Sequence, residues 1–169
     1  MWFVFFKGML KWAQLLACVS ILAACGKSYV TPETVVNAKE GVGIKGYDPV
    51  AYHAAAKPAE GNAEQAYEYA GVTYHFSTAE NKNAFALAPE KYIPAYGGYC
   101  AYAMSLGNVV DINPKNWAVV DGQLYLNANG FAQALWNLDR QGNIQDANRK
   151  WSAIKTKALE PSPENVNQQ

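Results

Sequence analysis

The feature that most restricts the fold is a short stretch of alternating apolar residues that turns back on itself. In residues 117–126, Asp121-Gly122 separates Trp117-Ala118-Val119-Val120 from Gln123-Leu124-Tyr125-Leu126. An Asp-Gly pair between two such runs is typical of a β-hairpin, because both turn positions need a positive φ. The sequence therefore predicts an antiparallel strand pair here.

A second hairpin is predicted over residues 66–77, with its turn at Ala70-Gly71. In its second strand Val72, Tyr74 and Phe76 share one face, because side chains alternate between the two faces of a strand. His75 falls on the opposite face.

Capping signals predict short helices around these hairpins. Their expected starts are Asp48-Pro49, Thr78 after the Ser77–Glu80 capping box, Tyr99, Phe131 and Ile144. The positions expected to be buried in the last two are Leu135, Trp136, Leu138, Ala147, Trp151 and Ile154. Hairpins mixed with short helices, without a βαβ rhythm, favour a small single α+β domain.

Composition excludes one class of partner. The chain has 14 Lys and Arg against 14 Asp and Glu, so its formal net charge is zero. Nucleic-acid binding is not predicted, because there is no basic block to neutralise phosphates.

Residues 1–24 have the pattern of a secretory signal peptide, with Lys7 and Lys11 ahead of an apolar run. The segment begins either at Met1 or at Met9, and both starts are compatible with the pattern.

The end of that segment, Leu22-Ala23-Ala24-Cys25, is similar to the lipobox of bacterial lipoproteins. The similarity implies acylation of Cys25, including palmitate, and anchoring through the lipid to a membrane. Gly26 follows Cys25, which by the same resemblance implies the outer membrane, with the protein facing the periplasm. A plain secreted protein with a coincidental cysteine is the alternative.

The expected organisation is then a signal peptide over 1–24, a tether over 25–41, a domain over 42–157 and a flexible tail over 158–169. The domain contains Cys100 as its single cysteine, so it holds no internal disulfide.

Four sequence blocks resemble the YHS domain family. They are Gly46-Tyr47-Asp48-Pro49-Val50-Ala51-Tyr52, Tyr74-His75-Phe76-Ser77, Tyr96-Gly97-Gly98-Tyr99-Cys100-Ala101-Tyr102-Ala103 and Asp121-Gly122-Gln123-Leu124-Tyr125-Leu126-Asn127. The resemblance implies a small module, often found near metal-handling or oxygenase proteins, and a treble-clef-like arrangement is one form it takes. Some relatives use paired cysteines for zinc. With Cys100 as the single cysteine of the domain, a four-cysteine zinc site is excluded.

Cys100 is the leading candidate for chemistry. It follows Gly97-Gly98 near the expected start of a helix, where free N–H groups favour a thiolate. With His75 or with Met104, which lies four residues further on, it would offer the donors that suit a soft ion such as Cu(I). A buried, inert thiol is the alternative, and a redox thiol is a third interpretation.

The remaining candidates are weaker. Asp48 and His53 could supply a ligand or a base, but a helix cap and an exposed histidine are the simpler interpretation. The chain lacks the G-x-S-x-G, H-E-x-x-H and C-x-x-C patterns, so no enzyme activity is predicted. The two hypotheses carried forward are a lipid-anchored soft-metal-binding protein, and a non-catalytic small-ligand or protein-binding module with Cys100 buried.

Overall fold

The structure, a computed structural model, describes residues 35–159. The helices and strands run in the order α1 (Ala51–Ala54), β1 (Asn62–Tyr69), β2 (Val72–Phe76), α2 (Ala79–Leu87), α3 (Ala101–Ser105), β3 (Asn113–Val120), β4 (Gln123–Asn127), α4 (Gly130–Leu138) and α5 (Arg140–Leu159). Short 3₁₀ turns connect them: η2 (Lys39–Gly41), η3 (Gly43–Gly46), η4 (Pro89–Lys91) and η5 (Ala95–Gly98). The predicted small α+β domain with two hairpins is confirmed.

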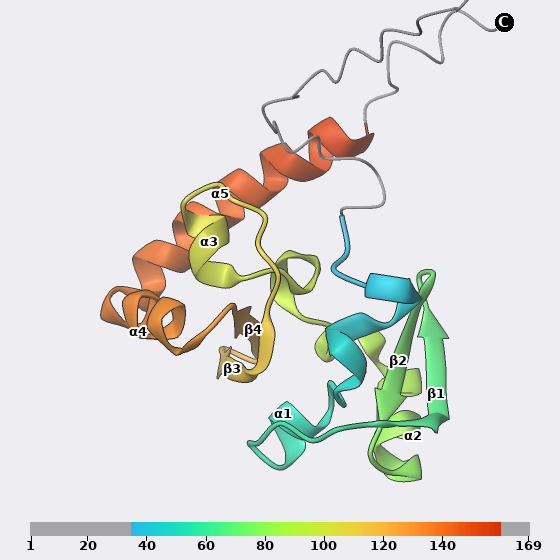
Figure 1. The fold of residues 1–169 in the computed structure, drawn as a ribbon. Coiled ribbons are helices and arrows are strands. Elements are labelled where there is room, and N and C mark those ends of the chain that lie inside the picture. The colour runs from blue at the N-terminus through green and yellow to red at the C-terminus, as the bar shows by residue number, and fades with distance from the viewer. Residues whose placement is uncertain (1–34, 160–169) are drawn as a thin grey trace, which may run out of the picture.

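Figure 1 shows two halves, with α1, α2 and the β1–β2 hairpin on one side and α3, α4 and α5 on the other. The expected signal peptide, Cys25 and residues 160–169 lie outside the described residues. Of the expected tether, residues 35–41 are described, and they lie against the body. There the backbone N–H of Asn37 donates to the carbonyl of Gly97 at 2.8 Å.

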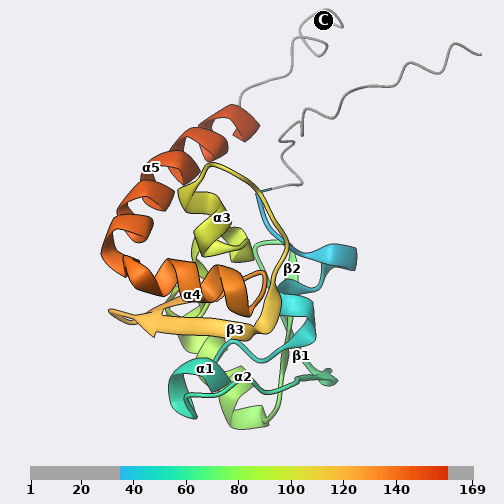
Figure 2. The ribbon, with the colours of Figure 1, turned by 60° about the vertical axis from the view of Figure 1, so that its left-hand side comes forward.

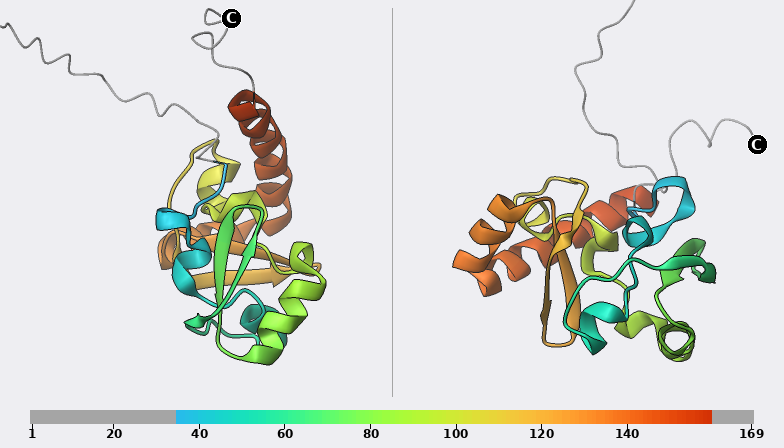
Figure 3. Two further views of the ribbon diagram at one scale, coloured as in Figure 1. Left: turned by 90° about the vertical axis from the view of Figure 1, so that its right-hand side faces the viewer. Right: turned by 60° about the horizontal axis from the view of Figure 1, so that its bottom comes forward.

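The first hairpin pairs β1 with β2 in antiparallel register, with Tyr69 opposite Val72. As predicted, Val72, Tyr74 and Phe76 form its buried face. Helix α2 packs on this face through Phe85, whose ring lies 5.1 Å from that of Phe76. In the left view of Figure 3 the hairpin stands in front, with α2 beside its lower end.

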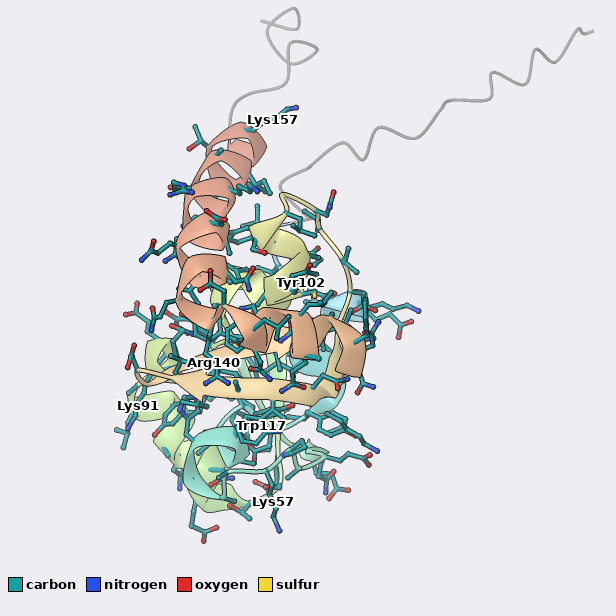
Figure 4. All side chains as sticks on the ribbon, turned by 90° about the vertical axis from the view of Figure 1, so that its left-hand side faces the viewer. Lys57, Lys91, Tyr102, Trp117, Arg140 and Lys157 are labelled. Atoms are coloured by element: carbon teal, nitrogen blue, oxygen red, sulfur yellow. The ribbon has the colours of Figure 1, made fainter. Side chains whose placement is uncertain are left out.

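The second hairpin pairs β3 with β4, with Val120 opposite Gln123. Helix α4 lies along β3 in Figure 2, and the side-chain amide of Gln133 donates to the carbonyl of Trp117 at 2.6 Å. Trp117 also meets the ring of Tyr52 in α1 edge-on at 5.3 Å, so β3 joins the two halves (Figure 4). Arg140 and Lys157, labelled in the same view, mark the two ends of α5.

Strand β4 is buried and separates two hydrophobic clusters. The first cluster comprises Ile44, Val50, Tyr52, Val72, Tyr74, Phe76, Phe85, Tyr92, Cys100, Ile112, Leu124, Leu126 and Ala132. The second cluster comprises Tyr96, Ala101, Met104, Tyr125, Trp136, Ile144 and Ala147. Leu124 and Leu126 join the first cluster and Tyr125 joins the second, because alternate side chains point to opposite faces.

Two local predictions are wrong. The N-cap of α2 is Thr78, whose hydroxyl accepts from the N–H of Asn81 at 3.1 Å, because Ser77 is engaged elsewhere. Leu138 is 82% exposed, although it was expected in the core. Helix α4 buries Ala132 and Trp136, and Leu138 lies about 200° around the helix from Trp136.

No helix within residues 35–159 combines the length and the apolar character that crossing a bilayer requires.

Candidate functional site

The carboxylate of Asp48 joins the first two sequence blocks. Its Oδ2 accepts hydrogen bonds from the backbone N–H of Ser77 at 2.8 Å, from the Ser77 hydroxyl at 2.6 Å and from the side-chain amide of Asn81 at 2.6 Å. Its Oδ1 accepts from the N–H groups of Val50 at 2.8 Å and Ala51 at 3.2 Å. Asp48 was expected as the N-cap of this helix, and that expectation is wrong, because the N-cap of α1 is Val50 and no side chain caps it.

Asp48 is fully buried, and all the polar groups that reach it belong to the protein's own framework. A carboxylate that accepts this many hydrogen bonds is held in place as an acceptor, and it presents no free oxygen to a visiting ion or substrate. We therefore assign Asp48 to the fold and not to chemistry.

The Cys100 thiol, like the Asp48 carboxylate, is buried and contacts groups of the protein itself. Cys100 is the N-cap of α3, and its Sγ accepts from the N–H of Ala103 at 3.4 Å. The thiol also lies 3.7 Å from Oδ1 of Asn127, to which it can donate. Cys100 is 1% exposed, and its side chain belongs to the first hydrophobic cluster.

Asn127 joins the third and fourth sequence blocks. Its Oδ1 accepts from the backbone N–H of Tyr102 at 3.1 Å, next to the thiol of Cys100. Cys100 also forms a parallel bridge with Leu126, so the two blocks meet along the backbone as well. The side-chain Nδ2 of Asn127 is buried and has no partner among residues 35–159.

Met104 does not join Cys100 in one donor set. Cys100 has an extended ψ of 118°, so it stands outside the helix and the four-residue spacing does not align the two side chains. Met104 is fully buried in the second cluster, whereas Cys100 belongs to the first.

His75 lies on the outer face of β2, opposite the buried face that packs on the first cluster with Cys100. It borders a surface hollow of about 540 Å³, which we call the His75 hollow. Its lining residues are Lys39, Glu40, Val42, Lys45, Gly46, Tyr47, Glu60, Gly61 and His75. Neither of the two sulfur candidates borders it.

Two glycines let the backbone approach His75 closely. A Cβ on Gly61 would lie 2.5 Å from the carbonyl carbon of His75, and one on Gly46 would lie 3.3 Å from the ring Nδ1. Gly46 also has a φ of 80°, which side-chain-bearing residues rarely adopt. The imidazole is therefore bracketed by two segments of backbone that connect η3 to β1.

The His75 hollow contains both signs of charge. The Tyr47 hydroxyl donates to Oε1 of Glu60 at 3.0 Å, and this hydrogen bond is the main reason that the pKa of Tyr47 is raised. Lys45 forms an ion pair with Asp111 at 2.7 Å at the edge of the hollow. The arrangement offers an imidazole, a phenol, carboxylates and ammonium groups to a small polar ligand.

In the part of the chain that the structure describes, no three His, Cys, Asp or Glu side chains are grouped so that they could hold a metal ion. Cys100, His75 and Met104 thus occupy three separate environments, and the metal role itself stays a prediction. Sequence reasoning missed Glu60 and Lys45 as residues of the His75 hollow. One sequence feature could have pointed to this hollow: Tyr47, which borders it, belongs to the same sequence block as Asp48.

His53 was expected to be exposed, and that expectation is wrong. Its ring lies edge-on to Tyr92 at 5.3 Å, and its Nε2 is buried without a partner within residues 35–159. Burial, followed by the nearby charge of Lys91, lowers the pKa of His53. The neutral ring acts as part of the packing between α1 and η4.

Comparison with known families gives one match. Residues 50–96 match the family model of the YHS domain. The matched range includes His75 and the hairpin, and it ends before Cys100 and Met104. No curated protein and no solved structure matches the chain.

Proposed function

This chain is a YHS-domain protein, and on that premise we propose that it is a lipid-anchored envelope module that binds a small polar ligand in the His75 hollow. The main support for this proposal is the position of the three donors predicted from the sequence. Within the described residues, His75 borders an open hollow, whereas Cys100 and Met104 are buried. An imidazole beside carboxylates and ammonium groups can pair with a ligand that has charges of both signs.

Cys100 serves the fold in this proposal. Its thiol caps α3 and lies beside Asn127, and only 1% of the residue is exposed. To bind a metal ion, the thiol would have to lose its proton and give up both contacts in an apolar surrounding.

A soft metal ion such as Cu(I) is the second candidate ligand, because YHS domains are associated with metal handling. In this alternative, the metal ion would be coordinated by Cys100 together with His75 or Met104. It requires an opening of β4 or α3 to bring donors together from separate environments.

The test maps binding by amide chemical shifts on a Cys25→Ser chain that starts at residue 25. One arm titrates Cu(I) under reducing conditions, and the other titrates free amino acids as small zwitterions. We expect shifts confined to the His75 hollow, abolished in His75→Ala and retained in Cys100→Ser and Met104→Leu. His53→Ala is the matched histidine control.

Binding of Cu(I) that survives in His75→Ala and is abolished in Cys100→Ser would reject the hollow and support the sulfur site. The absence of shifts at the hollow in both arms would reject the proposed site as well.

Membrane anchoring is a separate part of the proposal. It is supported by the sequence Leu22-Ala23-Ala24-Cys25 and by the ten-residue separation of Cys25 from Val35, the first described residue. We expect the full-length protein in the outer-membrane fraction of a Gram-negative host and Cys25→Ala outside it. Equal membrane association of the two chains would contradict acylation at this residue.

A further inference from the structure

The loop between α3 and β3, residues 106–112, presents apolar side chains to solvent although its backbone is fixed. Leu106 is 56% exposed and Val110 is 41% exposed. The carbonyl of Val110 accepts from the backbone N–H of Cys100 at 2.9 Å, and the neighbouring Val109 packs against the second cluster. The loop is therefore held in place, and a partner that covers its exposed side chains would not have to order it.

The C-terminal part of α5 lies beside this loop and is basic. Residues 149–159 contain no acidic residue and four basic ones: Arg149, Lys150, Lys155 and Lys157. Arg149 forms an ion pair with Asp146, whereas the three lysines are exposed and have no acidic partner within residues 35–159. Lys150 reaches the loop, since its Nζ donates to the carbonyl of Ser105, next to Leu106.

The chain leaves the body toward Cys25 at the same end of the molecule. The side-chain amide of Asn37 donates to Oδ1 of Asp111 in the loop at 2.9 Å, and Val35 lines one small hollow together with Trp151 of α5. Figures 2 and 4 show the loop, the C-terminal end of α5 and the start of the described chain on one side of the domain. We call this side the tether face, and it comprises Leu106, Val110, Lys150, Lys155 and Lys157.

The segment before Val35 limits how far the tether face can lie from a membrane. Cys25 precedes Val35 by ten residues, and an extended chain of that length spans at most about 35 Å. A lipid attached at Cys25 would therefore keep the tether face near the bilayer surface, whereas α1 and α2 lie at the far end of the domain (Figure 1). The acidic residue of the loop, Asp111, is compensated by its ion pair with Lys45.

The rest of the domain has the opposite charge. Residues 35–129 contain nine Asp and Glu against six Lys and Arg, a net charge of −3. An anionic surface would repel this part of the molecule and attract the lysines of α5. The charge distribution thus favours one orientation on such a surface.

We propose that the tether face docks on a bilayer that contains anionic phospholipids, with Leu106 and Val110 in the interface and the three lysines against the headgroups. The proposal rests on the membrane anchoring proposed above, because the lipid at Cys25 brings the face to the membrane. Each lysine close to an anionic surface contributes about fivefold to the affinity. The lipid then supplies attachment, and the tether face supplies orientation.

The test measures the partition of the Cys25→Ser chain, starting at residue 25, onto phospholipid vesicles by sedimentation. We expect binding to vesicles of phosphatidylcholine mixed with phosphatidylglycerol, and binding about tenfold weaker or less to phosphatidylcholine alone. Every variant keeps residues 160–169, so Glu160 and Glu164 contribute equally throughout.

Two triple variants locate the charge that matters. The test variant removes the lysines of the tether face: Lys150→Gln, Lys155→Gln and Lys157→Gln. Its affinity for the anionic vesicles should be about 100-fold weaker. The matched control removes the same charge from the segments around α1, α2 and η4: Lys57→Gln, Lys82→Gln and Lys91→Gln. Its affinity should change by about twofold at most, because salt screens distant charges.

A second pair of variants tests the apolar part of the tether face. Leu106→Ser should bind about tenfold more weakly, because the serine removes an apolar side chain from the interface. Phe131→Ser removes a side chain that is 74% exposed on α4 and should bind as the parent does. Thermal melts establish that each variant is folded.

Equal weakening in the two lysine variants would overturn the proposal, because binding would then follow net charge and not one face. Equal binding to both kinds of vesicle, or no binding to the anionic vesicles, would overturn it as well. A loss of binding in Phe131→Ser without one in Leu106→Ser would place the contact on α4 and reject the tether face. Because the tested chain carries no lipid, none of these results depends on acylation of Cys25, which fractionation decides separately.

Discussion

At the scale of single residues, Asp48 connects three segments of the chain through hydrogen bonds. Its two carboxylate oxygens accept five hydrogen bonds from α1, from the end of β2 and from α2. Removal of the carboxylate would leave buried N–H and O–H donors without partners, which costs more than the hydrogen bonds themselves contribute.

We therefore expect Asp48→Ala to lower the free energy of unfolding by about 3 kcal/mol. Urea denaturation followed by circular dichroism measures the change. Ser77→Ala is the matched comparison, because it removes a single hydroxyl from the same carboxylate and should cost about 1 kcal/mol. Equal losses in the two variants would show that the remaining contacts of Asp48 contribute nothing.

We expect His53 to make the stability of the domain depend on pH. Burial and then Lys91 lower its pKa in the folded protein below the ordinary value of 6.5. The unfolded chain therefore binds a proton more readily. The stability from the neutral ring is complete above pH 6.5 and is lost as the pH falls through 6.5 toward the lower folded value.

Between about pH 7 and about pH 5, we expect the free energy of unfolding to fall less in His53→Gln than in the parent, because the glutamine cannot titrate. The measurement is a series of urea denaturations across this range. If the free energy of unfolding changes with pH equally in His53→Gln and in the parent, groups other than His53 cause the pH dependence.

At the scale of elements, the two hairpins use the same turn with different residues. Asp121 has a φ of 51° and is followed by Gly122 at 78°, and Ala70 has a φ of 51° and is followed by Gly71 at 76°. Aspartate and asparagine tolerate the left-handed region better than alanine. The first hairpin therefore carries strain that the second avoids.

We expect Ala70→Asn to raise the free energy of unfolding by about 0.5–1 kcal/mol and Asp121→Ala to lower it by a similar amount. Thermal and urea unfolding of the two variants measure both changes. A loss of stability in Ala70→Asn would refute the assignment of strain to this turn.

The hairpins were predictable because their signals are local. Strand alternation located the buried face with Val72 and Tyr74, and Asp121-Gly122 located a turn. The cap of α2 was predicted one residue early, because Ser77 and Thr78 are both good caps and the choice depends on Asp48, which lies about thirty residues away.

The candidate site was less predictable for the same reason. The burial of Cys100 depends on β4, which follows it in the chain, and the opening beside His75 depends on Gly46 and Gly61, which precede it. Spacing along the sequence carries no information on such contacts. The local pattern predicted Asp48 as the N-cap of α1, but the helix begins later, and Asp48 instead accepts from the N–H groups of Val50 and Ala51.

At the scale of the whole molecule, β4 makes the two hydrophobic clusters depend on each other. Leu124 and Leu126 pack in the first cluster and Tyr125 packs in the second, so neither cluster is complete without the strand. Cys100 adds a backbone bridge to Leu126, and Trp117 adds a contact from β3 to α1. A loss of packing in one cluster should therefore also destabilise the other cluster.

This coupling predicts that the two halves unfold together. In Asp48→Ala, amides in β2 and amides in α4 should both exchange hydrogen about 100-fold faster, since about 3 kcal/mol is lost from one shared unfolding reaction. Exchange measured by NMR reports each half separately. Phe131→Ala, at an exposed position of α4, should leave both sets of amides unchanged. Faster exchange in β2 with unchanged exchange in α4 would mean that β4 separates the clusters without coupling them, and that each half is stable alone.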